Sequence, residues 1–252
     1  MPLTVPVMVA IAAVITLASV IQSSVGFAFA LFATPLLLWT GIPLPQVITI
    51  VSVSSFFSSL IGAGHLRASI PWRPALTASV VRIVMILAGL LILKKLVGLD
   101  GGSVRAVVGG ILILLVGMKL VYRARPAEKV HWLWGALAFS SSGLLVGICG
   151  MGGPPLVLWL LAHNWSTARI RGFLFVAFAV TIPVQIFLLY LVFGAEIMST
   201  AFWTLLLIPF ILLGTVVGLP LGNRLPKPLL RKIMNGILLI IGLSAILPVL
   251  AG

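Results

Sequence analysis

The stretch that decides the fold is Gly147-Ile148-Cys149-Gly150-Met151-Gly152-Gly153-Pro154-Pro155-Leu156-Val157-Leu158-Trp159. Glycine permits tight turns, and proline suits the first turn of a helix, where its missing N–H costs no hydrogen bond. The stretch therefore predicts a sharp turn followed by the start of a new helix. An earlier stretch, Gln22-Ser23-Ser24-Val25-Gly26-Phe27, leads to Pro35 and has a similar character.

The composition around these turns is that of a membrane protein. Of the 252 residues, 62% are apolar and only 8% are charged, whereas a soluble domain has about a quarter charged residues. This excludes a water-soluble enzyme and a DNA-binding domain, and it makes the lipid bilayer the chain's solvent. The 16 Lys and Arg against 3 Asp and Glu are better explained by loops that face the cytoplasm than by nucleic acid.

Glycine/proline clusters and charges divide the chain into ten apolar segments, where about 20 apolar residues suffice to cross a bilayer as a helix. We expect an all-α polytopic protein whose second and seventh segments are half-helices or re-entrant elements, because both are short and begin at a Gly-rich stretch. Irregular backbone at membrane depth is tolerated only where it is buried in protein or lines a cavity. The expected segments are 3–22, 25–40, 45–64, 72–93, 104–122, 131–149, 154–163, 170–193, 199–222 and 229–250.

The basic residues predict the orientation. If the segments alternate in direction, three basic residues, Lys94, Lys95 and Arg105, fall on one side. The side with more Lys and Arg faces the cytoplasm, so both termini are expected on the non-cytoplasmic side of the cell's inner (plasma) membrane. Twelve fall on the cytoplasmic side: Arg67, Arg73, Lys119, Arg123, Arg125, Lys129, Arg169, Arg171, Arg224, Lys227, Arg231 and Lys232.

The chain also resembles itself. Pro35-Leu36-Leu37-Leu38-Trp39 returns as Pro155-Leu156-Val157-Leu158-Trp159, and the stretch that begins at Arg105 returns, in the same order, at Arg231. Five segments in each half would insert the second half upside down, which is typical of secondary transporters with a site where the halves meet. Chance similarity between Leu-rich helices is the alternative.

This repeat divides the chain into a first membrane repeat (1–122), a cytoplasmic linker (123–130) and a second membrane repeat (131–252). The three parts form one integral membrane domain.

The two Gly/Ser/Pro elements predict a site for an anion. A helix that begins inside the membrane presents free N–H groups and about half a positive charge, and one such end comes from each half. The alternatives are that the small residues serve helix packing and that each serine bonds its own helix carbonyl. The candidate residues are Gly26, Gly150, Gly152, Gly153 and Pro154, with Gln22, Ser23, Ser24, Ser141 and Ser142 as donors.

Arg82 lies near the middle of the fourth segment. An arginine there costs roughly 2.5–3.5 kcal/mol on the insertion scale and normally faces a cavity or a partner. The three acidic residues, Asp100, Glu128 and Glu196, are all expected in loops. Arg82 is therefore a candidate clamp for two oxygens of an anion, or else a cap for buried carbonyls of a neighbouring helix.

Several of these stretches resemble the TauE/SafE family of sulfite exporters. They are the small-residue turn leading to Pro-Leu in both halves, Phe29-Ala30-Leu31 with Pro35, Ser58-Ser59-Leu60-Ile61-Gly62-Ala63 before His65, Arg67 and Trp72, and Gly150-Met151-Gly152-Gly153-Pro154-Pro155. The resemblance covers nearly the whole chain. It implies a permease that exports sulfite, sulfonates or related small organosulfur anions.

The residues favour a carrier over other functions. We expect alternating access, with a proton or sodium as the possible coupling ion, and no cofactor or metal. Membrane enzymes need a nucleophile with a base, a metal or an acid/base pair. The segments offer none, since His65, His131 and His163 are far apart. An anion channel or an accessory subunit without carrier activity is the alternative, and the oligomeric state cannot be read from the sequence.

Overall fold

The computed structural model describes residues 5–98, 110, 130–226, 228–229, 232 and 236. Over these residues the regular structure is helical, and six of the helices are long and apolar enough to cross a membrane. The expected all-α membrane fold is confirmed. The expected segments 104–122 and 229–250 lie almost entirely outside the described residues.

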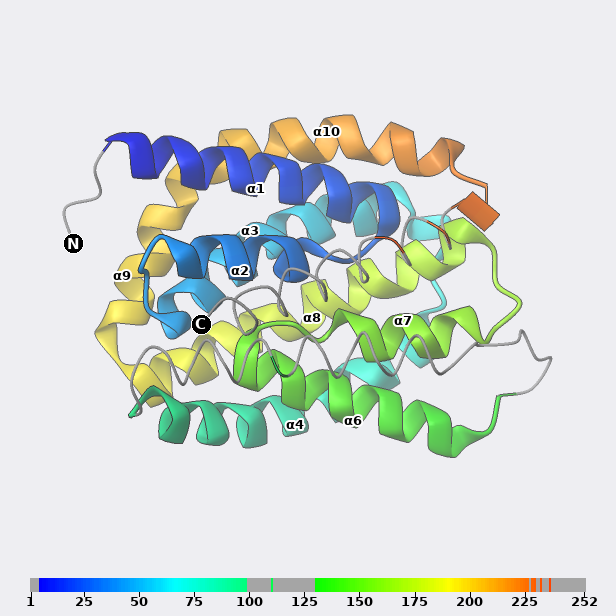
Figure 1. The fold of residues 1–252 in the computed structure, drawn as a ribbon. Helices are drawn as coiled ribbons and strands as arrows, with labels where there is room; N and C mark the ends of the chain where they lie inside the picture. Colours follow the sequence, from blue (N-terminus) through cyan, green and yellow to red (C-terminus); the bar gives the residue numbers. More distant parts are fainter. Residues whose placement is uncertain are drawn as a thin grey trace.

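The described part of the first half contains four α-helices. They are α1 (Val5–Val25), α2 (Phe29–Trp39), α3 (Leu44–His65) and α4 (Trp72–Val97), and the short 3₁₀ helix η1 (Arg67–Ser69) precedes α4. All four run roughly along the same direction in Figure 1, with α2 beside α3 in the middle of the bundle.

The second half opens with the same order of long, short and long helices. They are α6 (Trp132–Cys149), α7 (Gly153–Leu161) and α8 (Thr167–Phe193). The chain then continues through α9 (Ala195–Thr204), the 3₁₀ helix η2 (Leu205–Leu207) and α10 (Ile208–Arg224).

The ninth expected segment, 199–222, is not one straight span. It is interrupted by η2, and α10 begins next to Pro209, a position where proline is compatible with a new helix. In Figure 1, α9 crosses one end of the bundle and α10 then turns to run alongside α1. The Glu196 side chain, expected in a loop, lies in the first turn of α9 and is exposed.

The two short helices are confirmed. Helix α2 has 11 residues and α7 has 9, which correspond to about 16 Å and about 14 Å at 1.5 Å per residue. Neither length crosses a hydrocarbon core of about 30 Å. Each follows a helix that ends at a left-handed glycine, Gly26 at φ 90° and Gly150 at φ 75°.

The close approach of long helices depends on glycines. Gly143 and Gly147 of α6 touch the backbone of α4, where a Cβ at Gly147 would overlap the Ile86 carbonyl oxygen. Gly214, Gly218 and Gly222 of α10 touch α1 in the same manner. Such small-residue spacings of four allow membrane helices to pack backbone to backbone.

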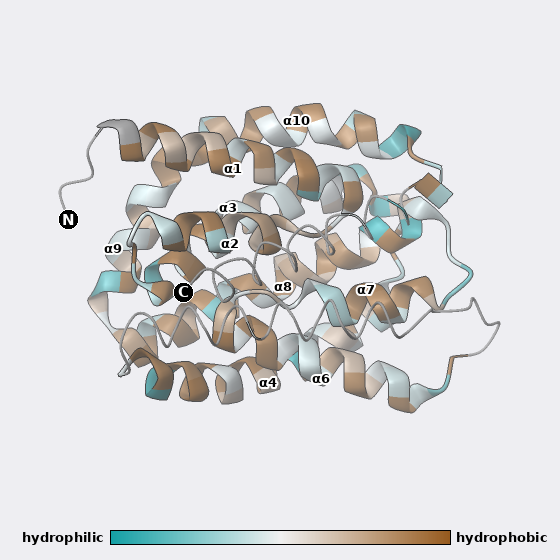
Figure 2. Cartoon of the chain, in the orientation of Figure 1, coloured by the Kyte–Doolittle hydropathy of each residue, from teal (hydrophilic) through white to brown (hydrophobic). Residues whose placement is uncertain are grey.

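Polar residues mark the two ends of the bundle, as Figure 2 shows. At one end the last residue of α3, His65, lies 2.9 Å from the Asn223 amide nitrogen near the end of α10. At the other end the Gln46 amide at the start of α3 donates to Glu196 of α9 at 3.4 Å. Helices α3 and α10 therefore end on one side of the molecule, and α9 begins on the opposite side.

Candidate functional site

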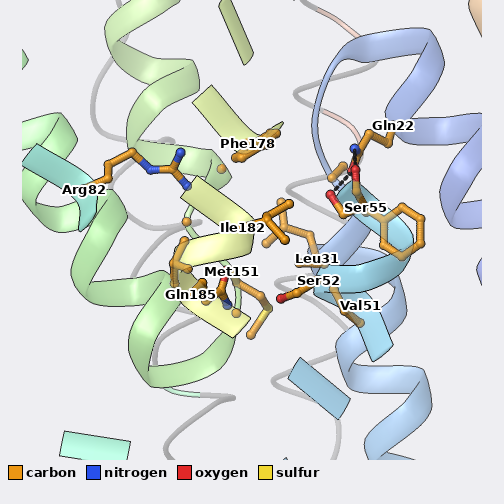
Figure 3. Close-up of a pocket in the computed structure, with 17 residues that line it drawn as sticks. Gln22, Leu31, Val51, Ser52, Ser55, Arg82, Met151, Phe178, Ile182 and Gln185 are labelled. Atoms are coloured by element: carbon orange, nitrogen blue, oxygen red, sulfur yellow. Dashed lines mark hydrogen bonds between the residues drawn. The ribbon is translucent and has the colours of Figure 1, made fainter. Parts of the chain in front are cut away.

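One cavity of about 40 Å³ lies where the starts of both short helices meet the long helices. Its lining includes Ala28 to Leu31 at the start of α2 and Gly150 to Gly153 at the start of α7. Side chains from α1, α3, α4, α6 and α8 also line it (Figure 3). A single buried water needs roughly 10–15 Å³, so the cavity has room for a group of about three or four water-sized atoms.

Of the residues expected to bind an anion, five line this cavity: Gln22, Arg82, Gly150, Gly152 and Gly153. Gln22 and Gly26 belong to the end of α1, and Val146 and Gly150 hold the corresponding places at the end of α6. The N–H of Gly26 donates to the Gln22 carbonyl at 2.6 Å, and that of Gly150 to the Val146 carbonyl at 2.9 Å. The same backbone turn thus brings each short helix back toward one cavity.

Arg82 extends from α4 toward α8 (Figure 3) and is only 1% exposed. Its Nη1 donates to the Ala177 carbonyl at 2.8 Å and to the Thr181 hydroxyl at 3.1 Å. The guanidinium also stacks over the Phe178 ring, 5.1 Å from its centroid. Its Nε has no hydrogen-bond partner among the described residues. Arg82 therefore holds a backbone carbonyl of α8 through Nη1, and the described residues leave the N–H of its Nε without an acceptor.

Gln22 is fixed to α3. Its Nε2 donates to the Ser55 carbonyl at 3.2 Å and to the Ser59 hydroxyl at 2.8 Å, while its Oε1 accepts from the Ser55 hydroxyl at 2.9 Å. Ser55 and Ser59 of α3 thus face α1, and Ser52 and Ser55 line the cavity.

The remaining candidates do not line the cavity. Ser24 and Ser141 bond carbonyls of their own helices, and Ser23 does so while also reaching the Ser58 hydroxyl at 3.1 Å. The Ser142 hydroxyl donates to the Gly152 carbonyl at 2.6 Å and so fixes the turn before α7. Gly26 packs against the backbone of Arg171, and Pro154 is buried in the first turn of α7.

Sequence reasoning missed Gln185 as a site residue. Gln185 is 2% exposed, lines the cavity from α8, and its Nε2 has no partner among the residues that the structure describes. The signal available was a lone amide within a span, two residues after Pro183.

A second buried arginine, Arg171, was counted among the basic residues of the cytoplasmic side and not among the candidate site residues. It lies in the first turns of α8 and is 1% exposed. Its guanidinium donates to the Ser23 carbonyl at 2.7 Å and to the Asn223 side-chain oxygen at 2.8 Å. It thereby satisfies a carbonyl in the last turn of α1, which a helix end leaves without an intrahelical donor.

The electrostatics of the cavity favour an anion. Two helix N-termini and a guanidinium each place positive potential there, and the described residues that line it include no carboxylate.

Comparison with known proteins identifies the family of the chain. The family model described as "Sulfite exporter TauE/SafE" matches residues 11–245. The chain belongs to the TauE/SafE family. It is also 23% identical over 219 residues to the "Probable sulfite/organosulfonate exporter TauE" of Cupriavidus necator, an alignment that covers 83% of this chain and 81% of that protein. No solved structure gives a significant match. Membership of the TauE/SafE family and the six apolar helices make the chain a multi-pass membrane transporter.

Proposed function

We propose that this transporter carries sulfite or a small organosulfonate across the membrane, with the anion bound in the cavity between α2 and α7. The observation that carries the proposal is the meeting of two helix N-termini and Arg82 at one cavity. The cavity of about 40 Å³ suits a headgroup of one sulfur and three oxygens.

The direction of transport is proposed to be outward. This rests on the family and on the relative in C. necator, whose name describes an exporter. The basic residues support a cytoplasmic location for the end of the bundle that carries Arg67, Arg73 and Arg224, with both termini on the other side.

Alternating access is supported by the correspondence between the two halves. The turns before the short helices lie 124 residues apart, since α1 and α6 end at Val25 and Cys149 and α2 and α7 begin at Phe29 and Gly153. In the proposed repeat, α1 corresponds to α6 and α4 corresponds to α10. Helix α6 packs on α4 through glycines of α6, and α10 packs on α1 through glycines of α10. An inverted repeat of 1–122 and 131–252, joined by 123–130, explains this exchange, and rocking of one half against the other would open the cavity to each side in turn.

The test is uptake and counterflow of labelled sulfite in proteoliposomes. We expect saturable uptake that is accelerated by unlabelled sulfite on the other side. Arg82→Met should lower the maximal transport rate divided by the half-saturation constant at least about tenfold. The reason is that hydrogen bonds to charged groups contribute roughly 1.5–3 kcal/mol. Lys94→Met, which removes an exposed charge at the end of α4, is the matched control.

Other outcomes would contradict specific parts of the proposal. Flux that neither saturates nor shows counterflow would indicate an anion channel, and no flux of any anion through folded protein would favour an accessory subunit. If Arg82→Met transports with unchanged kinetics, Arg82 has a structural role and does not bind the anion. Imposed proton and sodium gradients in the same vesicles test for the coupling ion.

A further inference from the structure

The two walls of the cavity differ in how their polar groups are used. On the wall formed by α1 and α3, the Gln22 amide is fully engaged. A side-chain amide nitrogen carries two hydrogens, and both are given to α3, at the Ser55 carbonyl and the Ser59 hydroxyl. Gln22 therefore ties α1 to α3 and has no donor left for a ligand.

The facing wall, formed by α8, contains the side-chain amide of Gln185, whose N–H groups make no hydrogen bond to the described residues. Gln185 is 2% exposed and its Nε2 has no hydrogen-bond partner among the described residues. In Figure 3 its side chain projects from α8 toward the middle of the view, where Met151 and Ser52 also end. Buried polar groups in native proteins are nearly always paired, and Gln185 lines the cavity. A ligand held there would supply the partner that the described residues do not.

A second unused donor lies on the same side. Arg82 bonds Ala177 and Thr181 of α8, which lie about two turns and one turn before Gln185, and its Nε has no partner among the residues described. The cavity-lining residues of α8, Phe178, Ile182 and Gln185, form a single face of that helix. Arg82 and Gln185 therefore approach the cavity from the side of α8.

The two short helices are also unequal. The first turn of α2 keeps the backbone N–H groups of Phe29, Ala30 and Leu31, which helix geometry leaves without intrahelical acceptors. The first turn of α7 contains Pro154 and Pro155, which have no N–H. The start of α2 is consequently the stronger source of backbone donors for an anion.

We propose that Gln185 is the substrate-binding amide of this transporter. Its Nε2 donates to an oxygen of the sulfite or sulfonate headgroup, Arg82 and the start of α2 balance the negative charge, and Gln22 acts only as a positioning residue. This inference rests on the proposed function. A headgroup with three oxygens can accept from these donors at once, and a carboxylate, with two, can satisfy fewer of them.

The test compares three variants in proteoliposomes that contain labelled methanesulfonate, a small sulfonate whose charge stays constant across the pH range used. Gln185→Leu removes the donor and should raise the half-saturation constant about tenfold or more. Gln185→Glu keeps the size but donates only when its carboxyl is protonated. Its half-saturation constant should rise as the pH is raised, whereas that of the wild type should not. Gln46→Leu, at the start of α3 and outside the cavity, is the matched control.

The outcomes separate this inference from the proposed function. Wild-type kinetics in both Gln185 variants at every pH, in a wild type that transports, would overturn the role of Gln185 and leave the carrier standing. If Gln185→Leu does not fold, the pH profile of Gln185→Glu decides alone. A wild type without saturable flux of sulfite or methanesulfonate would overturn the proposed function and this inference together.

Discussion

At the scale of single residues, the two buried arginines have different surroundings. Arg82 lines the cavity, and its Nε has no partner among the described residues. Arg171 lies at the end of the bundle, outside the cavity lining, and its terminal nitrogens bond Ser23, Leu219 and Asn223. Its Nε, like that of Arg82, has no partner among the described residues. Asn223 in turn contacts His65. Arg171 thus joins the ends of α1, α8 and α10 and, through Asn223, that of α3.

We expect Arg171→Met to destabilise the folded protein by about 2 kcal/mol, because a buried acceptor left without its donor costs roughly 1–3 kcal/mol. Thermal unfolding in detergent, followed by tryptophan fluorescence, measures the change. Arg67→Met removes an exposed charge from η1 and should leave the melting temperature nearly unchanged. Equal melting temperatures for the two variants would show that the Arg171 hydrogen bonds contribute no net stability.

At the scale of elements, glycine serves two purposes in α6 and in the turn that follows it. Gly143 and Gly147 allow α6 to contact α4, and Gly143 touches the backbone of Arg82 itself. Gly150 ends α6 in the left-handed region, where glycine has no steric penalty. Gly143 and Gly147 therefore serve helix packing, which was the alternative to anion binding for the small residues. Gly150 instead starts the turn that lines the cavity.

Gly147→Ala should destabilise the protein by about 1–3 kcal/mol, the usual cost of overpacking, because the new Cβ would overlap the Ile86 carbonyl of α4. The matched control is Gly64→Ala in α3, where the added Cβ meets no atom within 4 Å. Alanine favours a helix over glycine, so Gly64→Ala should be neutral or slightly stabilising. The yield of monodisperse protein and its melting temperature are the measurements. A Gly147→Ala variant as stable as Gly64→Ala would mean that α4 and α6 can separate at no cost.

At the scale of the whole molecule, the positions of the helix ends relate to the orientation of the protein in the membrane. The end of α3, the start of α8 and the end of α10 meet at one end of the bundle, because Asn223 bonds both Arg171 and His65. The exposed Arg73 begins α4 at this end, and the exposed Lys94 lies in the last turn of α4.

This arrangement predicts which sites a membrane-impermeant thiol reagent will reach in intact cells. Lys94→Cys should be labelled from outside, and Arg73→Cys should be labelled only after the membrane is opened. Cys149, the one cysteine of the chain, is buried and should give little background. The reverse labelling pattern would place the termini in the cytoplasm and overturn the proposed orientation.

Much of the fold could be predicted from the sequence because its determinants are local. Hydropathy and length identify spans, and glycine/proline clusters identify the turns before α2 and α7. The position of Arg82 inside a span also follows directly. The repeated Pro-Leu motif was a less accurate guide, since Pro155 lies in the first turn of α7 but Pro35 lies one helical turn deeper in α2.

Only the tertiary structure decided which polar groups are free to bind. Gln22 and Gln185 are both lone amides in apolar spans, and nothing local distinguishes them. The difference arises from partners distant in sequence: Gln22 finds Ser55, 33 residues away, whereas Gln185 finds no acceptor among the described residues for its Nε2. Arg82 is likewise held by a carbonyl 95 residues away. The sequence by itself determined a membrane transporter's helices and turns, because insertion into a bilayer depends on local hydropathy. Helix packing decided the donors of the site, because it determines which hydrogen bonds are already made.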